Sequence, residues 1–158
     1  MTRQYIGLRH KEESGEIFEH IKKIWDGRDV VIIEGEKSRL GVGNDLLDNA
    51  KSVKRILGPS RQAFSKYDEI LEEAKQIDKN SLILLALGPA ATCLAYDLHM
   101  LGYQAVDIGH VDVEYEWYKM KAKRKVPIKN KMVHEAVVNE IGEMHDTEYE
   151  NQIIAKIV

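Results

Sequence analysis

Short apolar runs alternate with helical stripes through the first two thirds of the chain. Residues 82–87 are six consecutive apolar residues that stop at Gly88-Pro89, which is typical of a strand covered on both faces. A helical stripe follows and closes at Gly102; its members are Leu94, Ala95, Leu98 and Leu101. Residues 104–108 predict a second strand. The segment is therefore a strand–helix–strand unit, whose crossover we expect to be right-handed.

The same alternation predicts the other elements. Further strands are expected at residues 30–34 and 52–57. Residues 151–158 suit a short edge strand, with a terminal helix turn as the alternative. Helices are expected to begin at Ser14, near Asn44 or Asp45, and at Ser60. Strands that alternate with helices predict an α/β fold, a Rossmann-like three-layer sandwich with a mostly parallel sheet.

Length and composition narrow the class of protein. The 158 residues are expected to form one domain, and the net charge of −3 argues against nucleic acid as a partner. No apolar run approaches about 18 residues and the N-terminus is polar, so we expect no membrane span and a cytoplasmic location. The single cysteine, Cys93, lies in an expected helix, which favours a small buried side chain over a reactive thiol.

The segment GEKSRLGVGN, residues 35–44, is the first candidate site because it follows a strand and precedes an expected helix. Glycines let a backbone approach a ligand closely, N–H groups at a helix start favour anions, and basic side chains suit phosphate. The candidate nucleotide-binding residues here are Glu36, Lys37, Ser38, Arg39, Gly41, Gly43 and Asn44. The dinucleotide fingerprint fails because Leu46 replaces its third glycine. A turn with solvated charges is the alternative.

A second strand-to-helix junction starts at Gly88 and Pro89 and continues with Ala90, Ala91 and Thr92. Its small residues and free helix N-terminus would admit a nucleotide's phosphates, so Gly88 and Pro89 join the candidate nucleotide-binding residues. Close packing of the helix on the sheet explains the same residues equally well.

Three acidic residues, Asp112, Glu114 and Glu116, lie just beyond the strand at 104–108, at the edge where ligands of open α/β sheets bind. If the backbone is extended, Asp112 and Glu114 point the same way and can share Mn²⁺ or Mg²⁺. On a helix those two diverge, and Asp112 meets Glu116 instead. The carboxylates are candidate metal ligands (Asp112, Glu114) and candidate catalytic bases (all three). The structural alternative is a helix N-terminus enriched in acids.

Two more residues nearby are candidates for substrate contacts. His110 can donate a hydrogen bond, and Trp117 can stack on a sugar or base, although both residue types more often serve structural roles. A run of lysines and one arginine over residues 119–131 could face a diphosphate or an acidic partner; a solvated loop is the commoner explanation.

Two long blocks carry a family resemblance. They are VVIIEGEKSRLGVGNDLLDNAKSVKRILGPS, residues 30–60, and LILLALGPAATCLAYDLHMLGYQAVDIGHVDVEYEW, residues 82–117. Both resemble the bacterial GT-D-type glycosyltransferase domain, formerly a domain of unknown function, and the likeness extends over about residues 3–138. The resemblance implies a Rossmann-like fold, transfer of a sugar such as glucose from UDP-glucose to a glycan or glycoprotein acceptor, including glycans on serine-rich-repeat adhesins, and a divalent cation held at a D-x-E triplet.

The chain resembles only the C-terminal part of that domain. The family's N-terminal portion contains an F-G-D-G-E-like stretch, and the nearest text here, Asp26-Gly27-Arg28, lacks the second acid. If that stretch is the metal triplet, Asp112-Val113-Glu114 is not its equivalent. The leading hypothesis is a metal-dependent UDP-sugar glycosyltransferase. The alternatives are a non-catalytic UDP-sugar-binding fragment or split-gene partner, which needs a second protein to supply the missing part, and a nicotinamide- or S-adenosylmethionine-dependent enzyme of similar fold.

Overall fold

A computed structural model gives the fold, and it describes residues 4–133 and 145–158. Within those residues, five parallel strands form one sheet in the order β4-β3-β1-β2-β5. The strands are β1 Asp29–Gly35, β2 Ser52–Gly58, β3 Leu82–Ala86, β4 Gln104–Asp107 and β5 Ile153–Lys156. The predicted parallel sheet is confirmed, including the edge strand near the C-terminus, and all five carboxyl ends point to the same edge.

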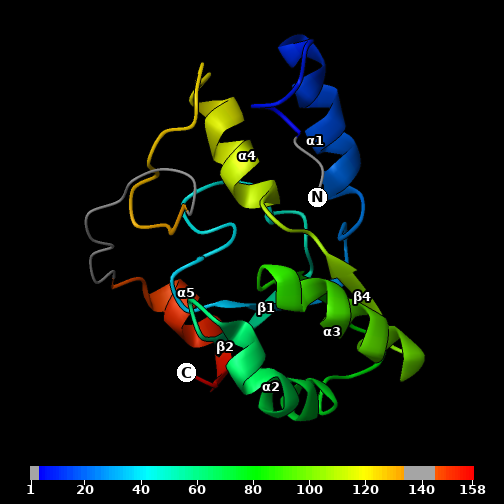
Figure 1. The fold of residues 1–158 in the computed structure, drawn as a ribbon. Helices are drawn as coiled ribbons and strands as arrows, with labels where there is room; N and C mark the ends of the chain where they lie inside the picture. Colours follow the sequence, from blue (N-terminus) through cyan, green and yellow to red (C-terminus); the bar gives the residue numbers. More distant parts are fainter. Residues whose placement is uncertain (1–3, 134–144) are drawn as a thin grey trace.

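Helices lie on both sides of the sheet, which confirms the three-layer sandwich (Figure 1). The helices are α1 Ser14–Lys22, α2 Tyr67–Ala74, α3 Pro89–Met100, α4 Val111–Lys119 and α5 Thr147–Gln152, with short 3₁₀ helices η1 Lys11–Glu13 and η2 Ala63–Lys66. Figure 1 shows α2 and α3 on one side of the sheet and α1 and α4 on the other. None of the helices in the described part of the chain is long and apolar enough to cross a membrane.

The two faces of the sheet explain why the centres of β1 and β3 are runs of apolar residues. Val31, Ile33, Ile83 and Leu85 pack with α2 and α3 in one buried cluster. The alternate residues of the same strands, Val30, Ile32, Leu82 and Leu84, pack in a second cluster with residues of α1 and α4. Successive side chains of a strand point to opposite faces, so a strand covered on both faces reads as a nearly continuous apolar run.

The end of α3 matches the sequence prediction for Gly102. Gly102 has a φ of 86°, and its N–H donates to the carbonyl of His99 at 2.9 Å. The next N–H, of Tyr103, donates to the carbonyl of Leu98 at 3.0 Å. This pair of bonds is a Schellman motif, which closes the helix and turns the chain directly into β4.

Three local predictions are wrong. No helix forms near Asn44: its side chain accepts the N–H of Leu46 at 3.0 Å, and this turn competes with a helix. The long helix predicted from Ser60 starts later, because Gln62, with a φ of 55°, lies outside helical geometry. It is also divided into η2 and α2 at Lys66, whose φ of −121° departs from a regular helix. Cys93 is exposed on α3, since the apolar face of that helix is formed by Ala90, Leu94 and Leu98.

Asp45 connects α1 and α4, the two helices that share one side of the sheet. Its carboxylate accepts hydrogen bonds from Lys22 of α1 at 3.1 Å and from Lys119 of α4 at 3.0 Å. The Tyr115 hydroxyl donates to it at 3.0 Å. Desolvation alone would raise the pKa of Asp45, but these three donors outweigh it and hold the pKa well below its usual range. The loop after β1 therefore fixes how α4 sits over the sheet.

Candidate functional site

A cavity of about 490 Å³ lies at the carboxyl ends of β1, β3 and β4. Segments that directly follow each of these strands line it, together with Met132. β1 is where the strand order reverses, because β2 lies on one side of it and β3 on the other. Open α/β sheets bind ligands in the crevice beyond such a point. We call this the rim cavity.

Five residues singled out from the sequence line the rim cavity: Ser38, Gly88, Pro89, His110 and Asp112. They come from three segments far apart in the chain, so the fold brings the loop after β1 and the acidic segment after β4 to one place. α3 begins at Pro89, and Thr92 of its first turn also lines the cavity. The positive end of this helix dipole therefore faces the cavity, which favours an anionic ligand.

The acidic segment is helical, so the extended alternative is wrong. Asp112 and Glu116 lie one turn apart on α4, and the Asn44 side-chain amide donates to both, at 2.9 Å to Asp112 Oδ1 and 2.7 Å to Glu116 Oε1. Residues four apart share a helix face, whereas residues two apart do not. Asp112 and Glu116 thus form the pair that the helical alternative predicted.

Glu114 points away from that pair. Its fully buried carboxylate accepts the N–H groups of Tyr5 at 3.0 Å and Ile6 at 2.7 Å, so it holds the N-terminal segment against α4. Asp112 and Glu114 therefore do not face one point, and the two do not fit a shared Mn²⁺ or Mg²⁺. In residues 4–133 and 145–158, no three His, Cys, Asp or Glu side chains gather where they could hold a metal ion.

A lysine lies beside the Asp112–Glu116 pair. The Lys131 ammonium contacts Asp112 at 2.9 Å and 2.8 Å, one distance to each oxygen, and Glu116 Oε1 at 3.0 Å. Its side chain is almost entirely buried. Of the two explanations for the basic segment, the commoner one, a solvated loop, is wrong for Lys131. Its position between the apolar residues Ile128 and Val133 is the sequence signal that could have found it.

The loop after β1 uses its N–H groups inside the protein. Leu40 N–H donates to Glu34 Oε2 at 2.8 Å, and Gly41 N–H donates to Asp112 Oδ1 at 2.9 Å. Two of the amides that would have cradled a phosphate thus already bind buried carboxylates. Burial raises the pKa of Glu34, while the Arg55 guanidinium, 2.6 Å away, and the Leu40 N–H pull it down.

The other candidate residues of this loop lie apart from one another. Glu36 accepts a hydrogen bond from Ser60 at 3.3 Å, and Lys37 is exposed. Arg39 donates to the carbonyl of Asn130 at 2.8 Å. Gly41, Gly43 and Asn44 line a different cavity, described next. The charged side chains expected around one diphosphate are therefore absent from the described lining of the rim cavity, and Ser38 is the candidate residue of this loop that lies there.

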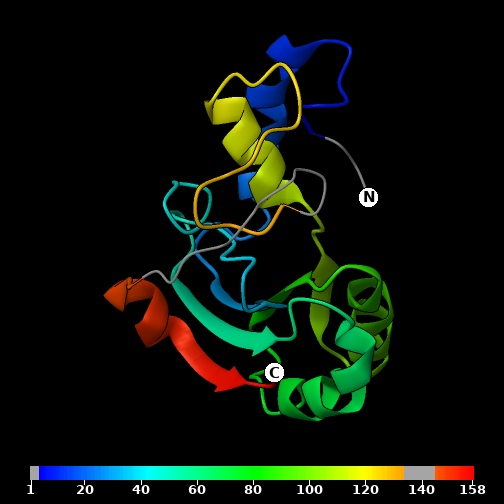
Figure 2. The ribbon, with the colours of Figure 1, turned by 60° about the vertical axis from the view of Figure 1, so that its left-hand side comes forward.

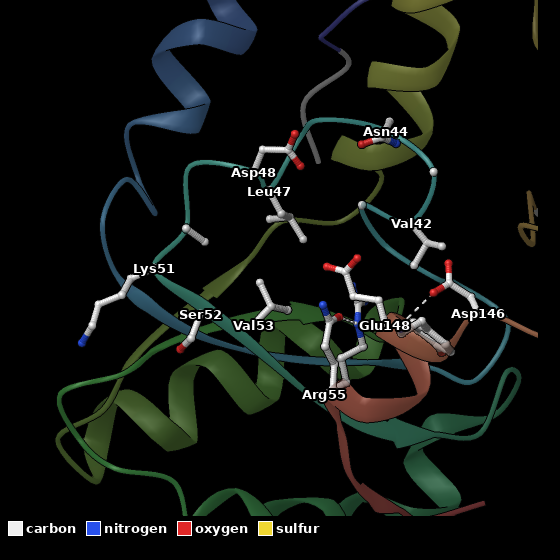
Figure 3. Close-up of a pocket in the computed structure, with 15 residues that line it drawn as sticks. Val42, Asn44, Leu47, Asp48, Lys51, Ser52, Val53, Arg55, Asp146 and Glu148 are labelled. Carbon is white, nitrogen blue, oxygen red and sulfur yellow. Dashed lines mark hydrogen bonds between the residues drawn. The ribbon is translucent and has the colours of Figure 1, made fainter.

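The second cavity, of about 500 Å³, lies between the loop after β1, the start of β2 and α5. Figure 3 shows Val53 and Arg55 of β2 close to Glu148, and the loop residue Val42 close to Asp146. Several of its polar groups already have protein partners: Arg55 binds Glu34 and Gln152, Lys51 binds Asp29, and Asp146 caps α5. The rim cavity is the better candidate site because it lies beyond the switch point of the sheet and faces the first turn of α3.

Trp117 does not reach either cavity. Its ring is completely buried, and its indole N–H donates to the carbonyl of Val126 at 2.9 Å. The expectation that it stacks on a substrate is wrong, because α4 turns this position toward the sheet. His110, in contrast, lies directly before α4 and lines the rim cavity.

The model of the glycosyltransferase GT-D fold family matches residues 1–136. This chain belongs to the GT-D glycosyltransferase family. It is 45% identical over 159 residues to "Glycosyltransferase GlyD" of Streptococcus pneumoniae serotype 4 (strain ATCC BAA-334 / TIGR4), covering 100% of this chain and 20% of that protein. It is 44% identical over 158 residues to "Probable glycosyl transferase Gly" of Streptococcus gordonii, covering 99% of this chain and 23% of that protein.

Solved structures of the GT-D family have the same fold. One, described as the highly conserved domain of unknown function 1792 with a distinct glycosyltransferase fold, has a TM-score of 0.94 at 47% identity and shares 99% of this chain and 57% of its own. Another, described as a new glycosyltransferase from Streptococcus sanguinis, has a TM-score of 0.94 at 44% identity. The match covers 99% of this chain and 59% of that one. The chain thus spans less than two thirds of these relatives.

Proposed function

We propose that this protein is a glycosyltransferase that transfers glucose from UDP-glucose to a glycan or glycoprotein acceptor, with the cytoplasm as its expected compartment. The observation that carries the proposal is the rim cavity: about 490 Å³ at the switch point of a GT-D-family sheet, facing the N-terminus of α3. A cavity of this size suits a ligand of small-molecule dimensions. Membership of the family supplies the class of reaction.

In this proposal different residues of the rim cavity bind different parts of the donor. The first turn of α3 and the hydroxyl of Ser38 bind the diphosphate, whose negative charge grows as the glycosidic bond to the donor breaks. The apolar side chains of Leu40, Val113 and Met132 hold the less polar part of the donor. His110 donates to the ligand from the position before α4. Thr92 keeps its hydroxyl on Asp107 at 2.7 Å.

The family resemblance also implies a divalent cation, Mn²⁺ or Mg²⁺. We propose that any such cation has ligands other than the pair Asp112 and Glu114, because Glu114 is committed to the N-terminal segment and Asp112 to Lys131. In the binding state a cation would add positive charge beside the diphosphate.

A second function is favoured by one observation, the short coverage of the relatives. Because the chain spans 57% of one solved relative and 20% of one curated relative, it can be a UDP-sugar-binding part that needs a partner for transfer. Both functions place the nucleotide sugar in the rim cavity. They differ in turnover: UDP release from UDP-glucose with Mn²⁺ by the isolated protein supports the enzyme, and binding without release supports the binding part.

Filling one cavity at a time tests where the nucleotide sugar binds. Thr92 is an exposed residue at the rim cavity, and Glu148 is an exposed residue at the second cavity. We expect Thr92→Trp to weaken UDP binding in calorimetry by at least about tenfold, a loss of about 1.4 kcal/mol. Glu148→Trp, which places the same bulk at the other cavity, should leave binding unchanged. The reverse pattern, or full binding by both variants, would contradict the assignment.

A further inference from the structure

We propose that Lys131 is a positioning residue for the rim cavity. The residues that follow α4, 120–133, turn back along the helix (Figure 2), and we call them the strap. The Lys131 ammonium ties the strap to α4 and thereby holds Met132 in the wall of the cavity. The ligand in question is the nucleotide sugar, so this step rests on the proposed function.

The contacts of Lys131 go to one face of α4. Its ammonium meets both oxygens of Asp112 and one of Glu116 at 2.8–3.0 Å, with 3% of the residue exposed. A buried ammonium is stable only when carboxylates surround it, and two carboxylates this close repel each other without a cation. The three side chains therefore act as one unit, and Lys131 is its only contribution from the strap among the described residues.

The residues on each side of Lys131 are fixed to the loop after β1. Met132 N–H donates to the carbonyl of Lys37 at 2.9 Å, and Arg39 donates to the carbonyl of Asn130 at 2.8 Å. Met132 then lines the rim cavity together with Ser38 and Leu40. Lys131 thus holds the junction of three segments: α4, the strap and the loop after β1.

The rest of the strap has its own anchors. Ile128 and Val133 are buried in the hydrophobic cluster on this side of the sheet. Loss of the ammonium leaves Asp112 and Glu116 without their cation and so lowers stability. Ile128 and Val133 still hold the rest of the strap in the core, so the short segment between these two residues is the part that is released. Because that segment carries the cavity wall, the expected defect is in binding of the donor more than in the chemical step.

Kinetics separate a positioning role from a merely structural one. For UDP-glucose hydrolysis by the whole protein, Lys131→Met should raise KM about tenfold and leave kcat within about twofold. Lys131→Arg should recover part of the binding because it keeps the positive charge. Lys123→Met is the matched control, since Lys123 is an exposed residue of the same strap, and it should behave like the wild type. A lower apparent kcat with unchanged KM would mean fewer folded molecules and would overturn the proposal.

Two further measurements keep the test decisive. Met132→Ala removes the wall without touching the ion pairs, and an unchanged affinity for UDP would overturn the proposal even if Lys131→Met fails to fold. If the wild-type protein neither binds UDP nor turns over UDP-glucose, the proposed function fails. Limited trypsin digestion then tests the anchoring of the strap: cleavage after Lys129, an exposed residue of the released segment, should be faster in Lys131→Met than in Lys123→Met, and equal rates would overturn the anchoring role.

Discussion

Arg55→Met is expected to lower the free energy of unfolding by about 3–5 kcal/mol, because it leaves the buried carboxylate of Glu34 without its cation. Arg55 donates to Glu34 at 2.6 Å and to Gln152 at 2.7 Å, and its guanidinium lies over the Tyr149 ring. Both members of the pair are at most 3% exposed at their side chains. Urea denaturation at pH 7 measures the loss.

The pH dependence of this loss identifies its cause. Without Arg55, burial holds the pKa of Glu34 above that of the unfolded chain, so the neutral form is the one that the fold accepts. The variant should therefore lose stability as pH rises above the unfolded pKa of about 4.3, and the gap to the wild type should narrow toward that pH. Lys54→Met, at an exposed neighbour on β2, should change stability by less than about 0.5 kcal/mol. A pH-independent loss would show that lost packing, and not an unpaired charge, is responsible.

Gly41→Ala is expected to have the second large effect, a loss of about 2–3 kcal/mol from left-handed strain and overpacking combined. Gly41 has a φ of 75°, and an added Cβ would lie 2.5 Å from Leu47 Cδ1 and 2.9 Å from its Cγ. Leu47 is buried in the core cluster, so its side chain has little room to move. The same shift would disturb the N–H that Gly41 donates to Asp112.

Gly43 provides the control for this substitution. It has a φ of 79° in the same loop, but an added Cβ would meet nothing within 4 Å. Gly43→Ala should therefore cost only the conformational strain, about 1 kcal/mol. Thermal and urea unfolding of both variants give the comparison. Equal losses would mean that the contact with Leu47 does not matter.

The sheet could be predicted because its signal is local. Each apolar run, such as residues 82–87, has to be covered on both faces. The ends of helices also have local signals: Gly102 ends α3 because glycine readily takes the positive φ that this turn needs. The failures also have local causes. Asn44 can either start a helix or bind the N–H of Leu46, and pattern alone does not weigh these two outcomes. Cys93 is exposed, against the prediction, because the residues that pack against the sheet determine which face of α3 is buried.

The site could be predicted only in part. The position of His110 and Asp112 beside Gly88 and Ser38 follows from parallel topology, since all these residues follow strands. The partners of the carboxylates could not be foreseen, because they depend on segments distant in sequence. Glu114 binds the N-terminal segment, and Asp112 binds Lys131. Residue types and topology therefore predicted where the site lies. Contacts with segments distant in sequence determine which of its side chains can bind a ligand.

A crystal structure of the protein with UDP bound would show where the nucleotide sugar binds. We expect the diphosphate at the first turn of α3, beside Ser38 and His110, with Met132 against the ligand. UDP in the cavity between the loop after β1 and α5, or at neither cavity under conditions where calorimetry shows saturation, would rule out the rim cavity as the donor site.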